Sequence, residues 1–191
     1  MKMDCLLSGV GGQGTVLASK LIAQAAMNRG SFVRTAETIG MAQRGGCVIS
    51  HVRVGDEIHS PMIPKGGADV IIGFEPGEAA RAFPFLKEDG VVIACTKAIR
   101  PVTASLSKDG YTGDTAIAYL NQNVKNLVLI DGDKICAELG SAKVLNVALL
   151  GAASQYLGFS MQEMEQAIAQ RVPERFVELN LKALHMGREC S

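Results

Sequence analysis

The chain has 191 residues, of which 48% are hydrophobic and 20% are charged, and its 19 Lys and Arg balance 19 Asp and Glu to a formal net charge of zero. Neither Lys nor Arg forms a run, so a nucleic-acid-binding surface and a membrane-surface helix are not expected. The length predicts one domain over residues 1–191. Without a basic, apolar leader or a membrane-spanning run, the sequence predicts a cytoplasmic protein.

The first predicted elements are a short apolar strand, a glycine-rich turn and a helix over residues 16–27. Gly9, Gly11 and Gly14 have the G-x-G-x-x-G spacing, which permits a tight turn and close approach of the backbone to a pyrophosphate. The free N–H groups that begin the helix also favour an anion. Thr15 stands where a P-loop carries Lys, which argues against hydrolysis of a nucleoside triphosphate. The turn is predicted to bind an anionic ligand; a turn that serves packing alone is the alternative.

A second predicted strand, residues 32–36, leads to Glu37. In dinucleotide-binding folds an acidic residue about 20 positions beyond the glycine motif hydrogen-bonds the adenosine ribose. The chain then departs from that pattern, because residues 38–46 are too few for a crossover helix. Residues 40–46 are interpreted as a loop, in which Arg44 and paired glycines suit contact with an anion or with the backbone of another chain. A solvated turn is an equally weighted alternative.

The middle of the chain predicts the sheet. Residues 47–54 alternate in polarity and are predicted to form a hairpin with residues 57–59. Three unbroken apolar runs follow, which is typical of parallel strands covered on both faces. They are residues 70–74, 91–95 and 127–130. The predicted fold is α/β and Rossmann-like, with three layers, a mostly parallel sheet and one β-hairpin. Ligands are then expected at the carboxyl ends of the strands, where Glu75 would line the site or cap a helix.

The last third, about residues 131–187, is predicted to be helical. Ser160 and Glu163 have the spacing of a capping box, and Pro173 suits the first turn of the final helix. The helices after Ala142 carry more apolar residues than a surface helix needs. They are therefore expected to be buried or to form a subunit interface.

The sequence predicts neither a catalytic residue nor a metal site on this chain. The three histidines are scattered and none stands in a recognisable arrangement with a nucleophile and a carboxylate. The five cysteines are far apart, without a C-x-x-C pair or Cys/His clustering, so no zinc or iron–sulfur site is expected.

The glycine motifs together carry a family resemblance. Residues 9–15, Glu37, residues 40–46 and Ser50 resemble the gamma domain of the 2-oxoacid:ferredoxin oxidoreductases, which include pyruvate, 2-oxoglutarate and indolepyruvate enzymes. The likeness extends through residues 67–69, Glu75, residues 130–131, Lys143 and Asn146, and so covers most of the chain. The separate small chain and the terminal helix around residues 178–184 most resemble the beta subunit of the indolepyruvate type.

This resemblance implies a subunit of a hetero-oligomeric oxidoreductase that supports oxidative decarboxylation of a 2-oxoacid, with coenzyme A as acyl acceptor and ferredoxin as electron acceptor. The chain lacks the Gly-Asp-Gly…Asn pattern of the family's thiamine-binding subunits. Thiamine diphosphate, magnesium and iron–sulfur clusters are therefore expected on a larger partner subunit, which also reaches ferredoxin, and little activity is expected of this chain alone. A contact to coenzyme A is the implied role of its loops. The cofactor-binding candidates are Gly9, Gly11, Gly12, Gln13, Gly14, Thr15, Glu37, Gln43, Arg44, Gly45 and Gly46.

Two other functions remain open at this point. One is a free-standing NAD-dependent dehydrogenase that uses the same glycine turn and Glu37, although no general acid or base can be named for it. The other is a purely structural subunit whose glycine turn packs against its partner. The sequence does not identify the 2-oxoacid, because the decarboxylation pocket would lie on the partner.

Overall fold

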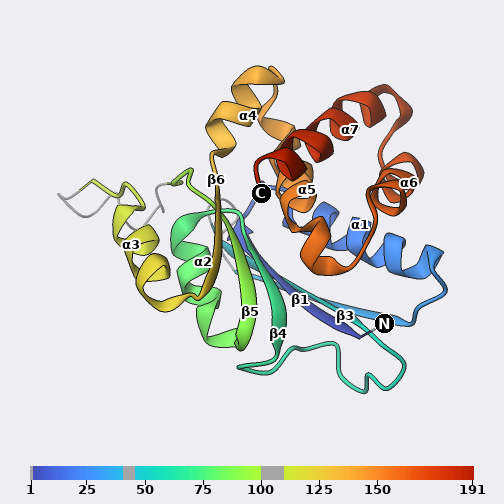
Figure 1. The fold of residues 1–191 in the computed structure, drawn as a ribbon, viewed down its shortest axis with the longest axis horizontal. Coiled ribbons are helices and arrows are strands. Elements are labelled where there is room, and N and C mark those ends of the chain that lie inside the picture. The colour runs from blue at the N-terminus through green and yellow to red at the C-terminus, as the bar shows by residue number, and fades with distance from the viewer. Residues whose placement is uncertain (1, 41–45, 100–109) are drawn as a thin grey trace.

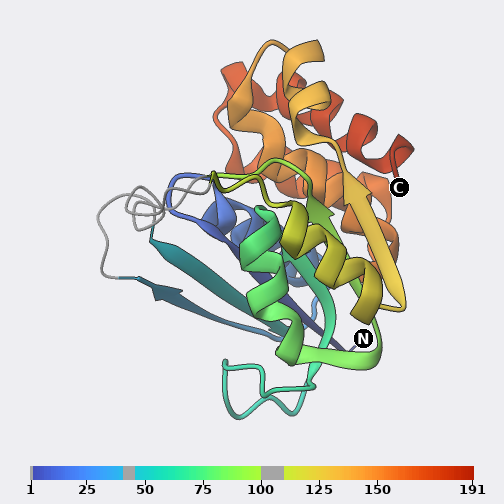
Figure 2. The ribbon, with the colours of Figure 1, turned by 90° about the vertical axis from the view of Figure 1, so that its left-hand side faces the viewer.

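The computed structural model describes residues 2–40, 46–99 and 110–191. In these ranges the chain forms a six-stranded sheet between two layers of helices (Figures 1 and 2). The elements, in chain order, are β1 (Met3–Val10), α1 (Thr15–Asn28), β2 (Val33–Ile39), β3 (Cys47–Val54), β4 (Ala68–Gly73), α2 (Pro76–Ala82), β5 (Leu86–Cys95), α3 (Asp114–Asn123), β6 (Asn126–Ile130), α4 (Gly132–Glu138), α5 (Leu145–Leu157), α6 (Met161–Arg171) and α7 (Glu174–Glu189).

The strands follow the order β2-β3-β1-β4-β5-β6 across the sheet. Strands β1, β4, β5 and β6 pair in parallel, whereas β3 is antiparallel to both of its neighbours. The predicted α/β fold with a mostly parallel sheet, one hairpin and a helical last third is confirmed. The carboxyl ends of β1, β4, β5 and β6 therefore meet at one edge, where ligands bind in open α/β sheets.

The predicted partner of β3 is wrong. Instead of residues 57–59, β3 pairs with β2, and Glu37 lies opposite Ser50. Residues 57–59 form no strand and belong to a segment that side chains hold against the sheet. Nε of Arg34 donates to the carbonyl of Ile58 at 2.7 Å, and the N–H of Ile63 donates to Nδ1 of His51 at 3.1 Å. Long-range side-chain contacts thus replace the predicted strand pairing.

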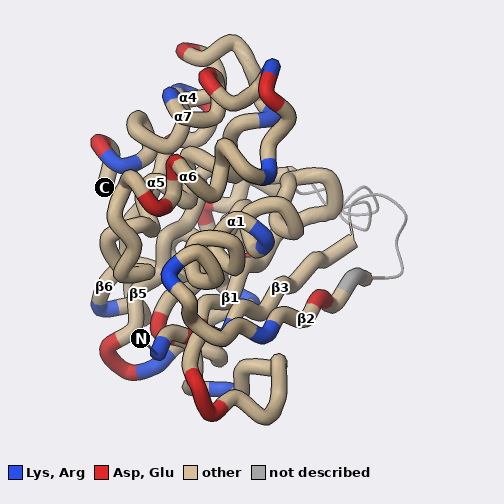
Figure 3. The backbone as a smooth tube through the Cα atoms, turned by 90° about the vertical axis from the view of Figure 1, so that its right-hand side faces the viewer, with Lys and Arg blue, Asp and Glu red and all other residues tan. Residues whose placement is uncertain are grey.

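Both faces of the sheet are apolar. β1 is buried along its whole length, and its successive side chains enter opposite layers: Leu7 packs with α1 and the C-terminal helices, and Leu6 packs with α2 and α3. This double burial explains why the central strands read as unbroken apolar runs. On the side shown in Figure 3, acidic and basic residues are interspersed and neither sign dominates.

The C-terminal helices pack unusually closely. A Cβ on Gly151 of α5 would lie 1.9 Å from the carbonyl oxygen of Leu184 on α7, and a Cβ on Gly187 would lie 1.8 Å from that of Ala148. Only glycine allows the two backbones to approach in this way. Among the described helices, none has the length and apolar character that a bilayer crossing requires.

Candidate functional site

The glycine turn joins the end of β1 to the start of α1 at the carboxyl edge of the sheet. Gly12 and Gly14 have φ angles of 97° and 83°, a left-handed conformation that glycine adopts without strain. Gly14 is the N-cap of α1, and this helix start has no side-chain cap. The first N–H groups of a 14-residue helix, at the positive end of its dipole, are therefore available to a negatively charged group.

Gln13 fixes the shape of this turn. Its Oε1 accepts a hydrogen bond from the N–H of Val10, and its Nε2 donates to the carbonyl of Phe74, both at 2.7 Å. Glycine is also needed at position 9, since a Cβ there would lie 2.8 Å from Cβ of Phe74 and 2.9 Å from Oε1 of Gln13. Both polar groups of the Gln13 amide thus tie the turn to β1 and to the end of β4.

α5 holds the turn from the other side through Asn146, which is only 3% exposed. Its Nδ2 donates to the carbonyl of Gly14 at 3.4 Å, and a Cβ on Gly14 would lie 2.7 Å from that nitrogen. Oδ1 of Asn146 is buried and has no hydrogen-bond partner in the described structure. The sequence resemblance includes Asn146, and the structure shows that its side chain contacts the glycine motif directly.

A pocket of about 280 Å³ opens beside the turn. It is lined by Gly11, Gly12, Gln13, Lys97, Ile99, Cys136, Ala142 and Leu145. Lys97 follows β5 and its ammonium pairs with Asp133 of α4, which raises the pKa of Lys97. The lysine is therefore charged at neutral pH. Burial raises the pKa of the Cys136 thiol, which keeps it protonated.

Sequence reasoning missed Lys97. A signal was nevertheless present, because Lys97 lies two residues beyond an unbroken apolar strand, at the sheet edge where ligands are expected. The uncapped helix start gives this edge a positive character, and the Lys97 ammonium, although paired with Asp133, places a hydrogen-bond donor beside the pocket. The arrangement can hold an anionic group such as a phosphate.

A second polar cluster follows β4. Glu75 is 2% exposed, and its Oε2 accepts from the N–H of Glu78 at 3.0 Å as the N-cap of α2, while its Oε1 accepts from the hydroxyl of Tyr111. Of the two predicted roles, capping is the one the structure shows. Burial and the neighbouring Glu75 raise the pKa of Tyr111. Burial and Glu78 also raise the pKa of Cys47, to about 12, so neither group is ionised at neutral pH.

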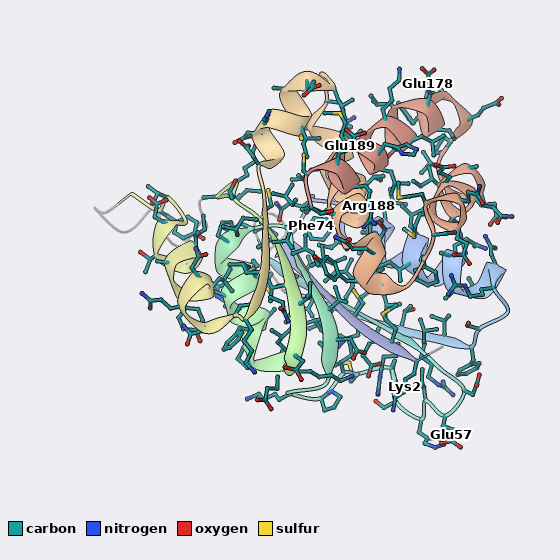
Figure 4. All side chains as sticks on the ribbon, in the orientation of Figure 1. Lys2, Glu57, Phe74, Glu178, Arg188 and Glu189 are labelled. Carbon is teal, nitrogen blue, oxygen red and sulfur yellow. The ribbon has the colours of Figure 1, made fainter. Side chains whose placement is uncertain are left out.

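A larger pocket, of about 440 Å³, lies elsewhere. It is lined by residues that include Lys2, Asp4, Arg53 and Glu57, at the amino end of β1. Figure 4 shows Lys2 and Glu57 at the opposite end of the sheet from Phe74, which follows β4. Arg53 and Asp4 already form an ion pair with Nε to Oδ1 at 2.8 Å. We therefore place the candidate site at the glycine turn rather than in the larger space.

The other predicted residues lie at varied distances from the turn. Gly46 is beside it, because the N–H of Gly11 donates to the carbonyl of Gly46 at 2.9 Å. Glu37 lies on β2, which β3 separates from β1, whereas the dinucleotide fold on which its predicted role rests has the second strand directly beside the first. Gln43, Arg44 and Gly45 lie outside the described residues.

No group of His, Cys, Asp and Glu side chains in the described ranges is arranged to hold a metal ion. At the turn itself, the described groups include main-chain N–H groups, the ammonium of Lys97 paired with Asp133, and the protonated thiol of Cys136. This set suits the binding and positioning of an anion.

Comparison with known proteins identifies the family. The model for pyruvate ferredoxin/flavodoxin oxidoreductase matches residues 4–190. The chain belongs to this family. The predicted resemblance to its gamma subunits, and the predicted role as a subunit of such an oxidoreductase, are confirmed.

Relatives within the oxidoreductase family have nearly the same length as this chain. The indolepyruvate oxidoreductase subunit IorB of Archaeoglobus fulgidus is 40% identical over 190 residues, which cover 98% of this chain and 94% of that protein. The crystal structure of the gamma subunit of a keto/oxoacid ferredoxin oxidoreductase from Geobacter sulfurreducens has a TM-score of 0.72 at 28% identity, covering 98% of this chain and 96% of that one.

The same fold recurs inside a longer family chain. The 2-oxoglutarate:ferredoxin oxidoreductase of Magnetococcus marinus, with 2-oxoglutarate, coenzyme A and succinyl-CoA bound, matches with a TM-score of 0.73 at 17% identity. The match covers 99% of this chain and 31% of that one. At this identity the likeness extends to the fold alone.

Proposed function

We propose that this chain is the non-thiamine subunit of an indolepyruvate-type oxidoreductase, which supports coenzyme A-dependent oxidative decarboxylation of a 2-oxoacid with ferredoxin as electron acceptor. The observation that carries the proposal is the likeness to the IorB subunit along almost the whole of both chains. The chain would act in the cytoplasm, within a hetero-oligomer.

The glycine turn is the proposed contribution of this chain to the site. The N–H groups at the start of α1 and the ammonium of Lys97 suit an anionic part of coenzyme A, and the pocket at Gly11 and Gly12 leaves room for it. Gly46 would border the same ligand. Arg44 is the predicted second contact, and with Gln43, Gly45 and Glu37 it stays a prediction.

The remaining cofactors belong, in this proposal, to a larger partner subunit. Thiamine diphosphate with magnesium would supply the carbanion chemistry, and iron–sulfur clusters would carry electrons to ferredoxin. The described residues of this chain offer no cluster of cysteines or carboxylates for either group. The proposed part of this chain is to bind, orient and enclose the anionic part of coenzyme A.

Native purification tests the function. The copurifying protein is identified and assayed for thiamine diphosphate and acid-labile sulfide, and the complex is assayed for ferredoxin reduction that depends on indolepyruvate and coenzyme A. A large partner with both cofactors supports the proposal. A lone chain that binds NAD instead would overturn it and favour the dehydrogenase alternative.

The variant Gly12→Asp tests the site. A Cβ on Gly12 meets nothing within 4 Å, so the new carboxylate adds charge beside the helix start without a clash, although the left-handed φ of 97° at this position adds backbone strain that the control variant shares. We expect the affinity of the assembled complex for coenzyme A to fall about tenfold or more.

Gly30→Asp is the matched control, since Gly30 also has a left-handed φ, of 80°, and open space, but lies beyond the other end of α1. The control should keep wild-type affinity. Equal affinity in both variants would remove the glycine turn from the site while leaving the subunit role intact. Loss of assembly in Gly12→Asp alone would favour a purely structural turn.

A further inference from the structure

The two edges of the sheet differ in character. β2 carries Arg34 and Glu37, charged residues that protect an edge strand from pairing with another chain. β6, at the opposite edge, has the sequence Asn-Leu-Val-Leu-Ile and no charge between Asn126 and Ile130. Figure 2 shows β6 at the margin of the molecule with no further strand beside it. An apolar, unprotected edge of this kind is a template for strand pairing.

The alternation of main-chain direction along β6 determines which of its N–H and carbonyl groups are free to pair with another strand. The N–H of Thr96, directly after β5, donates to the carbonyl of Ile130 at 2.9 Å, so the main-chain groups of Ile130 point toward β5. Because direction alternates along a strand, Val128 also faces β5, whereas Leu127 and Leu129 direct their N–H and carbonyl groups outward. The free edge thus presents two donors and two acceptors, centred on Val128.

The side chains at this edge are only partly covered. Leu127, Val128 and Leu129 are each of intermediate exposure, unlike the fully buried residues of β4 and β5. A surface pocket lies along the same edge and is lined in part by Val128 and by Tyr156 of α5, which is 39% exposed. The edge therefore leaves apolar surface in water that a second strand would remove.

We propose that β6 is the site at which two copies of this chain pair, antiparallel and about a two-fold axis through Val128, to form one continuous sheet. In this register Leu127 lies opposite Leu129 of the second copy, and both direct their hydrogen-bonding groups toward each other. Val128 faces Val128 of the second copy at a non-hydrogen-bonded position. The interface is self-complementary, as a two-fold axis requires.

Charge complementarity selects a second copy as the occupant. The register that satisfies the outward main-chain groups also places Lys125 opposite Asp131 of the other copy, and symmetry makes this contact twice. Nζ of Lys125 lies 3.3 Å from Glu88 and 3.7 Å from Asp89, but these exposed pairs hold it weakly. Among the described residues, the side chain of Asp131 accepts one hydrogen bond, at Oδ1 from the N–H of Lys134, and its charge remains available.

Charge reversal at Lys125 tests the pairing in the full-length chain. In Lys125→Glu a carboxylate faces Asp131 of the other copy at both ends of the interface, and we expect the dimer to dissociate about tenfold more readily. Lys182→Glu is the control, because the two lysine side chains are both 61% exposed and only Lys125 lies at the edge. Sedimentation over a concentration series gives the dissociation constants, and thermal unfolding confirms that both variants fold.

Cysteine cross-linking tests the register. In a Cys190→Ser background, which removes the exposed native thiol, Val128→Cys should form an intermolecular disulfide on mild oxidation. The paired Cα atoms would lie about 4.5 Å apart, within disulfide range. Leu127→Cys should not cross-link, because Leu127 lies opposite Leu129 of the other copy and its own symmetry mate is offset by two residues along the strand.

Three results would overturn the inference: a monomer at all concentrations, a dimer equally stable in Lys125→Glu and Lys182→Glu, or cross-linking at Leu127→Cys without cross-linking at Val128→Cys. A fourth contrary result would be slow amide hydrogen exchange in β6 that is seen only when another kind of subunit is present. None of these outcomes bears on the oxidoreductase role, which is assayed separately.

Discussion

Gln13 links the glycine turn to the neighbouring strand through both polar groups of its side chain. The pocket side of the turn is open. The conformation of the turn therefore depends on the hydrogen bonds that the side chains of Gln13 and Asn146 form with the main chain. Such hydrogen bonds fix the conformation of the turn before a ligand binds. Their loss is expected to alter stability as well as affinity.

Replacement of Gln13 by Ala removes both 2.7 Å hydrogen bonds and leaves the carbonyl of Phe74 without its side-chain donor. We expect the free energy of unfolding to fall by about 1–3 kcal/mol. Urea unfolding of the full chain measures the change. Gln155→Ala is the control, because Gln155 is exposed and its side chain forms, within the described ranges, one hydrogen bond, to Ser191 at 3.3 Å. An equal loss in both variants would contradict the stabilising role of Gln13.

The sequence indicated the glycines of the turn but not the side chains that hold the turn in place. The spacing of Gly9, Gly11 and Gly14 reflects local backbone geometry, which the sequence carries directly. Lys97 and Tyr111 reach the same edge from distant segments, and their contacts depend on how β5 and the segment before α3 are placed by packing. Asn146 was indicated only by family resemblance, not by its physical role.

Helices α5 and α7 pack with their backbones in close contact at Gly151 and Gly187. The contact depends on the absence of side chains at Gly151 and Gly187, so it is set by backbone shape rather than by hydrophobicity.

The variant Gly151→Ala tests this contact. The added methyl group would overlap the carbonyl of Leu184, and separating the helices would also loosen the apolar core beneath them. We expect a loss of about 3 kcal/mol in the free energy of unfolding. Gly110→Ala is the control, since a Cβ there meets nothing within 4 Å and Gly110 has no left-handed φ; a similar loss in both variants would contradict the argument.

The elements themselves were largely predictable, and their partners were not. The apolar runs correspond to β4, β5 and β6, and the capping box at Ser160 is present at the start of α6. The hairpin was assigned to the wrong neighbour because alternation in β3 reports which face is buried, not which strand lies beside it. Helix α3 was not predicted, as its residues carry no strong apolar periodicity.

The whole molecule should be most stable between about pH 7 and 8.5. On the acid side, burial and the charge of Arg53 lower the pKa of His51. The unfolded chain therefore takes up this proton first, and stability falls as the pH drops below about 6.5. Ion pairing with Arg29 lowers the pKa of Glu163 to about 2, so a second loss follows between about pH 4.5 and 2.

On the alkaline side the sign is reversed. Burial raises the pKa values of Cys5 and Cys47, and burial with Glu75 raises that of Tyr111, so the folded state keeps protons that the unfolded chain releases. Stability then falls as the pH rises above about 8.5. Thermal unfolding across this range measures the profile. In His51→Gln the loss between pH 6.5 and 5.5 should shrink, and an unchanged acid slope would contradict the assignment.

The hydrogen bonds that fix the glycine turn affect the rate at which a ligand binds. A site whose shape is fixed by Gln13 and Asn146 before any ligand arrives needs no rearrangement to accept one. Encounter is then governed by diffusion and by attraction between the ligand's negative charge and the ammonium of Lys97, and it slows as added salt screens that attraction. Related anions would arrive at similar rates, and the time each remains bound would distinguish them.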